Sequence, residues 1–188
     1  MDTYFDKIWY DISKNNILGY DDTKLLFEIL LSCPKDGETA EIGVYKGKTS
    51  RMIMMATEAY KNHYAYDTFS GIIDSREGMD GPLNGEYKAS VGEFMKTIGS
   101  TFSQRVILKN GNWRERINDE STLFSFVYVD TGTYESTKGL LNCMIPRMMD
   151  GGKIVFYSGS NCYGVKQAID EECNSIENKG PFSVFSKI

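Results

Sequence analysis

Acidic and glycine residues stand where predicted strands end, in an arrangement that suits a nucleoside cofactor. Residues 41–50 read E-I-G-V-Y-K-G-K-T-S, with Glu41 inside a short strand and Gly43 and Gly47 in the turn that follows. Glycines between a strand and a helix let the backbone approach a ligand closely. The dinucleotide fingerprint G-x-G-x-x-G is not met, and Glu41 suits a cationic group, such as the α-ammonium of S-adenosylmethionine, better than a pyrophosphate. The alternative is a glycine turn shaped only by packing.

A second carboxylate, Asp67, follows the next predicted strand in Y-D-T-F. At such a strand end a carboxylate accepts hydrogen bonds from both ribose hydroxyls of a nucleoside. Asp67 follows Gly47 by about 20 residues, the separation expected of a nucleoside-binding pair. The alternative is that Asp67 caps a helix or a turn.

A third carboxylate, Asp130, ends a strand just before T-G-T-Y-E-S, near the place where a transferred methyl group would point. We expect Asp130 to act as a general base, with Tyr157 or Tyr134 orienting the acceptor. Glu135 and Ser136 are expected instead to stabilise the start of a helix. The residues expected to bind the cofactor are Glu41, Gly43, Tyr45, Lys46, Gly47, Thr49, Ser50, Asp67, Thr68, Phe69, Asn110, Gly111, Asn112, Trp113 and Asp130.

Short strands that alternate with helices must hold these side chains. The predicted strands cover residues 40–44, 63–66, 106–108, 124–129, 153–156 and 182–185. The predicted helices cover residues 3–16, 22–32, 49–60, 88–98, 136–149 and 165–176. This alternation is typical of βαβ units, and the apolar strand at 126–129 is typical of a sheet covered on both faces. We therefore predict an α/β protein with a mostly parallel, doubly wound sheet and helices on both faces.

The length of 188 residues predicts one domain over residues 1–188, which begins with a helical segment at 1–36. Residues 70–86 hold four glycines and a proline and carry no apolar periodicity. Long loops in compact domains are commonly functional, so we expect this loop to be a mobile lid over the acceptor.

Composition argues against several other classes of protein. The net charge of −5 disfavours a nucleic-acid binder, and none of the four cysteines stands at C-x-x-C spacing, so neither a zinc site nor a disulfide framework is indicated. No apolar stretch is long enough for a membrane span. We expect a cytoplasmic protein with a small-molecule partner, no nucleic acid and no membrane. Whether the chain forms a homodimer is left open.

Six sequence blocks come in one order across residues 39–171: A-E-I-G-V-Y-K-G-K-T-S, Y-D-T-F-S-G, G-E-Y-K-A-S, Y-V-D-T-G-T-Y-E-S-T-K, I-P-R-M-M-D-G-G and G-V-K-Q-A-I-D. Together they resemble the macrocin O-methyltransferase family. The resemblance implies a Rossmann-like class I methyltransferase that converts S-adenosylmethionine to S-adenosylhomocysteine and methylates sugar hydroxyls.

The sequence departs from that family at its magnesium site and its proposed general-base histidine. The family places one aspartate after the fourth strand and an Asp-Asp pair after the fifth. Asp130 matches the first, whereas the pair falls on Tyr157 and Ser158. One carboxylate makes a weak site for a hard cation, so we expect no metal ligands and no magnesium. His63 precedes the second strand and is expected to be structural or solvated.

We therefore expect a metal-independent methyltransferase whose acceptor is a sugar or natural-product hydroxyl. An amine acceptor remains open, because a neutral amine attacks without a base. Two alternatives also remain: a catalytically inactive cofactor-binding homologue that acts as a partner protein, and an NAD-type oxidoreductase.

Overall fold

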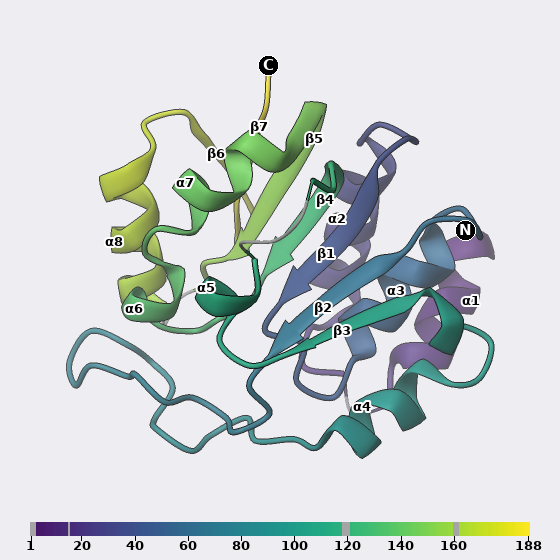
Figure 1. The fold of residues 1–188 in the computed structure, drawn as a ribbon, viewed down its shortest axis with the longest axis horizontal. Coiled ribbons are helices and arrows are strands. Elements are labelled where there is room, and N and C mark those ends of the chain that lie inside the picture. Colours follow the sequence, from purple (N-terminus) through teal and green to yellow (C-terminus); the bar gives the residue numbers. More distant parts are fainter. Residues whose placement is uncertain (1–2, 15, 118–120, 160–161) are drawn as a thin grey trace.

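The computed structural model describes residues 3–14, 16–117, 121–159 and 162–188. Its centre is a seven-stranded sheet in the order β3-β2-β1-β4-β5-β7-β6 (Figure 1). Strands β1 to β5 pair in parallel, β7 pairs antiparallel with β5, and β6 pairs antiparallel with β7. The strands are β1 (Glu38–Ile42), β2 (His63–Asp67), β3 (Val106–Asn110), β4 (Phe124–Val129), β5 (Met148–Tyr157), β6 (Ile176–Lys179) and β7 (Phe182–Ser186). The predicted α/β fold class is confirmed.

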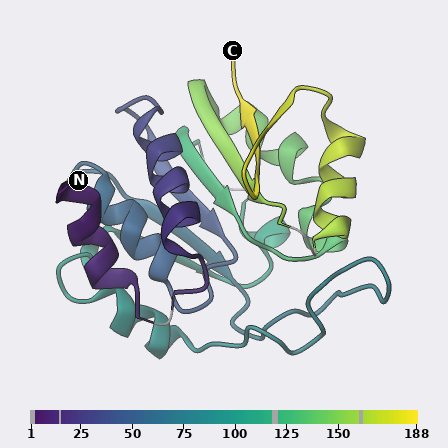
Figure 2. The same ribbon diagram turned by 180° about the vertical axis from the view of Figure 1, so that it is seen from behind.

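Helices cover both faces of this sheet, as Figures 1 and 2 show from opposite sides. Side chains alternate along β4, so Phe126 and Tyr128 pack in one core cluster while Val127 and Val129 pack in another. The first face carries α1 (Thr3–Ile12), α2 (Tyr20–Leu31) and α3 (Lys48–Ala56). The second carries α5 (Trp113–Arg116), α7 (Leu140–Met144) and α8 (Tyr163–Glu172). The remaining short elements are α4 (Val91–Ile98), α6 (Tyr134–Thr137), η1 (Ser103–Arg105) and η2 (Ile145–Arg147).

The predicted helix over residues 136–149 is wrong as a single element. Gly139 interrupts it in a left-handed conformation with φ of 83°, so that α6 and α7 are separate short helices. Pro146 then follows in the 3-10 turn η2, where the missing N–H of proline is tolerated. Met148 and Met149 belong to β5, which runs on through Gly151 and Gly152 into the predicted strand at 153–156.

The predicted helix over residues 165–176 is also too long at its C-terminal end. α8 ends at Glu172, and Ile176 begins the unpredicted edge strand β6. β6 turns back into β7 at Gly180, where φ is 54°. The described part of the chain contains no helix that is long and apolar enough to cross a membrane.

Candidate functional site

A cavity of about 650 Å³ lies at the carboxyl ends of β1, β2 and β4, where the chain order across the sheet reverses. Ligands of open α/β sheets bind at such switch points. The loop over residues 70–86 and the segment that follows β5 close its sides. The predicted site residues that line this cavity are Gly43, Tyr45, Asp67, Thr68, Gly111, Asn112, Trp113, Asp130 and Tyr157.

A small recess of about 30 Å³ shares Gly43, Tyr45 and Asp130 with the main cavity. It reaches along the turn between β1 and α3 toward the buried end of Glu41. The other predicted residues that line it are Glu41, Lys46, Gly47 and Thr49. The structure therefore brings the glycine turn and the second and third carboxylates to one connected region.

Both glycines of this turn are required by close contacts as well as by conformation. Gly43 has φ of 89°, and a Cβ atom there would lie 2.2 Å from the carbonyl oxygen of Asp130. Gly47 has φ of 82°, and a Cβ atom there would lie 2.7 Å from the ring of Phe94. Conformation and packing together explain Gly47, whereas Gly43 allows the turn after β1 to lie against the backbone of Asp130.

Glu41 is buried beneath the turn and already has a partner within the chain. The Ser50 hydroxyl donates a hydrogen bond to its carboxylate, and His63 Nε2 lies 3.7 Å from Oε2. Burial raises the pKa of Glu41 well above its usual value, although the Ser50 bond opposes this. His63 is fully buried beside Thr39, and burial lowers its pKa to about 3, so it is a neutral core residue.

Asp67 accepts three backbone hydrogen bonds from the chain itself. Oδ2 accepts from the N–H groups of Val44 at 2.9 Å and Tyr45 at 2.8 Å, and Oδ1 accepts from Phe69 N–H at 2.7 Å. Tyr45 and Phe69 have φ of 48° and 55°, a region that bulky residues rarely adopt. Burial raises the pKa of Asp67, and these bonds oppose the rise. A carboxylate offers about four acceptor positions, and these three bonds leave one on Oδ1, although the backbone N–H of Thr68 also contributes to lowering the pKa of Asp67.

Asp130 lies at the end of β4, with its backbone N–H bonded to the carbonyl of Ile42 at 2.9 Å. Burial raises the pKa of the Asp130 carboxyl to about 6, while a hydrogen bond of 3.4 Å from the Tyr128 hydroxyl opposes the rise. Tyr157 lines the same cavity, and burial, followed by the charges of Cys162 and Asp130, raises its pKa. With a pKa of about 6, the Asp130 carboxyl can hold or release a proton near neutral pH.

Four predicted residues line neither cavity. Phe69 packs in the core against Phe94, and Ser50 holds Glu41. Asn110 contributes its carbonyl to Arg116. The Tyr134 hydroxyl donates a hydrogen bond of 2.7 Å to Glu171 on α8, so the structure does not place it at the cavity with Asp130.

Sequence reasoning missed several side chains that complete the cavity. Tyr87 lines it and packs edge-on against Tyr45 at 5.8 Å between ring centroids. Cys162 also lines it, and burial and the charge of Asp130 raise its pKa to about 11. Ile17 enters from the segment before α2. The position of Cys162 soon after a strand end was a usable signal, whereas Ile17 and Tyr87 arrive through distant loops.

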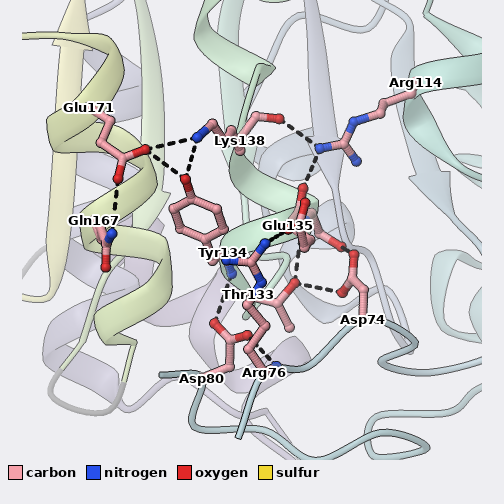
Figure 3. A network of polar contacts seen from close by, with 11 residues as sticks. Asp74, Arg76, Asp80, Arg114, Thr133, Tyr134, Glu135, Lys138, Gln167 and Glu171 are labelled. Carbon is pink, nitrogen blue, oxygen red and sulfur yellow. Dashed lines mark hydrogen bonds and ion pairs between the residues drawn. The ribbon is translucent and has the colours of Figure 1, made fainter. Parts of the chain in front are cut away.

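The loop over residues 70–86 is held against the start of α6 (Figure 3). Asp74 accepts hydrogen bonds of 2.7 Å from the hydroxyls of Thr133 and Ser136. Asp80 accepts from the backbone N–H of Tyr134 at 2.8 Å. The Arg76 guanidinium pairs with Glu135 and lies 4.6 Å from the ring centroid of Tyr134. These contacts hold the loop against the segment that follows Asp130.

The described residues include no group of three or more His, Cys, Asp or Glu side chains that could hold a metal ion. Tyr157 ends β5 and Ser158 follows it, at the positions where the resembled family has its carboxylate pair. The Ser158 hydroxyl pairs instead with Ser183 at 2.8 Å. Neutral hydroxyls are poor ligands for a hard cation, so the donor set does not fit magnesium.

The cavity does fit S-adenosylmethionine. Its volume lies within the range of about 300–1,000 Å³ usual for small-molecule sites. The cofactor carries a sulfonium and an ammonium group, and Glu41, Asp67 and Asp130 are carboxylates that burial has left short of solvation. A cation bound among them would relieve that cost.

Comparisons with known proteins identify the family and the fold. A family described as "Methyltransferase domain" matches residues 40–157. No curated protein matches the sequence.

Three solved structures share the fold. One is the O-methyltransferase NovP, with 18% identity and a TM-score of 0.74 over 92% of this chain and 81% of that one. Another is CalS11, described as a TDP-rhamnose 3'-O-methyltransferase of calicheamicin biosynthesis, with 18% identity and a TM-score of 0.62 over 98% and 93%. The third is an O-methyltransferase from Bacillus cereus in complex with S-adenosylhomocysteine, with 10% identity and a TM-score of 0.61 over 100% and 92%. The family match covers more than half of the residues, so the chain belongs to the methyltransferase-domain family, on the fold of the class I S-adenosylmethionine-dependent enzymes.

Proposed function

We propose that this protein transfers the methyl group of S-adenosylmethionine to a hydroxyl of a small sugar or natural product, without a bound metal. The observation that carries the proposal is the cavity at the ends of β1, β2 and β4, which Asp130 lines, in a chain whose residues 40–157 match a methyltransferase family. Natural-product O-methyltransferases share the fold at low identity, which supports this acceptor class. The finer resemblance to the macrocin O-methyltransferases points the same way.

In this proposal the glycine turn and Asp67 bind the cofactor, which supplies an electrophilic methyl group. Gly43 lets the turn lie close to Asp130, and Oδ1 of Asp67 has one acceptor position left for a ribose hydroxyl. Glu41 sets the charge beneath the turn, toward the ammonium group. Trp113 is fixed by its Nε1–H bond of 2.8 Å to the carbonyl of Ser136 and forms one wall of the cavity.

Asp130 takes the acceptor proton in this proposal. A hydroxyl nucleophile must lose its proton as it attacks, and a carboxylate whose pKa is about 6 is largely ionised at neutral pH while remaining a usable base. Tyr157 shares the cavity and can orient the acceptor by a hydrogen bond. The loop over 70–86 then acts as a lid that excludes water, and Asp74 and Asp80 hold it closed.

Calorimetric titration with S-adenosylhomocysteine, and with NAD as the control, tests the cofactor. Turnover is then followed as release of S-adenosylhomocysteine from a panel of sugars, glycosides and phenols, with and without EDTA. Binding of S-adenosylhomocysteine with no affinity for NAD is expected. Binding without turnover of any acceptor would favour the alternative of an inactive cofactor-binding homologue, and tight binding of NAD would contradict the proposal.

A further inference from the structure

Among the residues that the structure describes, the main cavity is lined by acidic side chains and by no basic one. Its described lining includes Asp67, Asp80, Glu86 and Asp130, with no lysine, arginine or histidine among the residues that form it. Small-molecule sites that accept phosphate or carboxylate groups usually supply arginine, lysine or a set of backbone N–H groups. At the strand ends beside the cavity, the backbone N–H groups of Val44, Tyr45 and Phe69 are already bonded to Asp67.

Three cations near the cavity are engaged with other groups, and Lys48 lines only the small recess. Lys46, on the small recess, lies 3.9 Å from a carboxylate oxygen of Glu93. Arg76 pairs with Glu135 across the closed loop (Figure 3). Arg114 donates to the backbone carbonyls of Glu135 and Lys138. An anionic acceptor in the main cavity would therefore meet carboxylates, and the described lining of that cavity supplies no cation to offset them.

The negative charge of Asp130 acts on the part of the cavity formed by Tyr87, Tyr157 and Cys162, which is called the acceptor side below. Its charge contributes to raising the pKa of three groups that line the cavity on different segments, namely Tyr87, Tyr157 and Cys162. Bound S-adenosylmethionine has a net charge of about +1, which offsets one carboxylate of four. The field on the acceptor side thus stays negative with the cofactor in place.

The rim of the cavity is apolar and exposed. Ile17, Ile73 and Tyr163 line the cavity and keep 58%, 55% and 69% of their surface in contact with solvent. Large apolar side chains that gather at a pocket mouth commonly contact a ligand. They suit an acceptor with an apolar body that extends out of the cavity.

We propose that the acceptor carries no negative charge, and that it is a neutral or cationic hydroxyl compound with an apolar body rather than a sugar nucleotide or other phosphate ester. The inference rests on the proposed function and narrows its substrate class. Selection against anions follows from repulsion within the site, which discriminates between acceptors as effectively as added attraction does.

The negative electrostatic potential of the cavity is measured with a cysteine introduced at the rim of the cavity. Tyr163→Cys is treated with a cationic trimethylammonium-ethyl methanethiosulfonate and with its anionic sulfonatoethyl counterpart, and modification is quantified at that position by mass spectrometry. Tyr60→Cys is the matched control, because Tyr60 is 71% exposed and precedes the opposite end of β2. The ratio of cationic to anionic rates should be about tenfold higher at the rim than at the control in low salt, and should fall in Glu86→Gln. Equal ratios at the two positions would overturn the proposal.

The acceptor class is measured separately on protein saturated with S-adenosylhomocysteine. Calorimetric titration with TDP, the anionic part of a sugar nucleotide, should show no saturable binding in the millimolar range. Saturable binding of TDP to the loaded protein would overturn the proposal. The reporter experiment uses protein without cofactor, so its outcome does not depend on cofactor binding. A failure to bind S-adenosylhomocysteine would refute the proposed function, whereas the ratio of modification rates would still test the negative charge of the cavity.

Discussion

Replacement of Asp67 by alanine distinguishes a residue that only binds ribose from one that also builds the site. Asp67→Ala removes the acceptor for the backbone N–H groups of Val44, Tyr45 and Phe69. Two of those residues are held in left-handed conformations that are unfavourable without such bonds. The turn between β1 and α3 should therefore loosen even when no cofactor is present.

The size of the effect follows from the three hydrogen bonds. A lost bond costs about 1 kcal/mol, so Asp67→Ala should lower the free energy of unfolding by about 3 kcal/mol. For a chain of this length that corresponds to a fall in Tm of about 6–12 °C. Affinity for S-adenosylhomocysteine should fall by about tenfold or more, because both the ribose contact and the shape of the turn are lost.

The assay combines thermal unfolding of the free protein with calorimetric titration of S-adenosylhomocysteine. Asp67→Asn keeps one carbonyl oxygen and should give an intermediate loss. The matched control is Asp150→Ala, whose side chain is 88% exposed and 4.0 Å from Lys187, and which should change stability by less than about 0.5 kcal/mol. An unchanged Tm in Asp67→Ala together with weakened binding would refute the structural part of the reasoning; unchanged affinity would remove the ribose contact.

Three further predictions concern the base, the lid and the buried histidine. Asp130→Asn should lower kcat by about a hundredfold or more in a turnover assay while S-adenosylhomocysteine still binds, and EDTA should not alter the wild-type rate; inhibition by EDTA that magnesium reverses would contradict this. Asp74→Ala should speed hydrogen exchange of residues 70–86, measured by mass spectrometry, because two bonds to the segment after Asp130 are lost; slow exchange like that of the wild type would argue against a held lid. His63 has its pKa lowered from 6.5 to about 3, so the unfolded state takes up a proton that the folded state does not, and stability is lost as pH falls through that window. Denaturant titrations should show that, relative to His63→Gln, the wild type loses about 1.4 kcal/mol of its free energy of unfolding per pH unit between pH 6 and 4. Parallel pH profiles of the two proteins would instead show that His63 is accessible to protons in the folded state.

The parts of the site that sequence predicted well are those encoded by neighbouring residues. Each of Gly43, Asp67 and Asp130 directly follows or ends a short apolar run, and parallel strands necessarily place such residues at one edge of a sheet. The parallel direction of the strands, and the position of these residues at the strand ends, were therefore enough to predict that the three lie together. The alternation of strands and helices predicted the sheet for the same reason.

The parts that sequence predicted poorly depend on contacts between distant segments. Tyr134 follows β4 like a site residue, but α6 turns its hydroxyl toward Glu171 on α8. The strand β6 is short and half polar, and it exists only because β7 is beside it. Tyr87 reaches the cavity through a loop whose path is fixed by contacts such as those of Asp74 with α6. No local periodicity carries this information.

The carboxylates of the site make the free protein less stable than its fold would allow. Glu41 is buried, its pKa is raised mainly by burial, and the charges of Asp130 and Asp67 raise it further. An apolar cavity floor would avoid that cost, so the carboxylates are better explained by a ligand than by folding. A cofactor with a sulfonium and an ammonium group offsets these charges when it binds, whereas NAD, with its two phosphates, would add to them. The main cavity is lined by Asp67, Asp80, Glu86 and Asp130, and its acceptor side stays negative because a ligand of net charge near +1 cannot neutralise four carboxylates. The carboxylates of the strand ends and of the loop over 70–86 together therefore account for the expected preference for a cationic cofactor and for the expected exclusion of anionic acceptors.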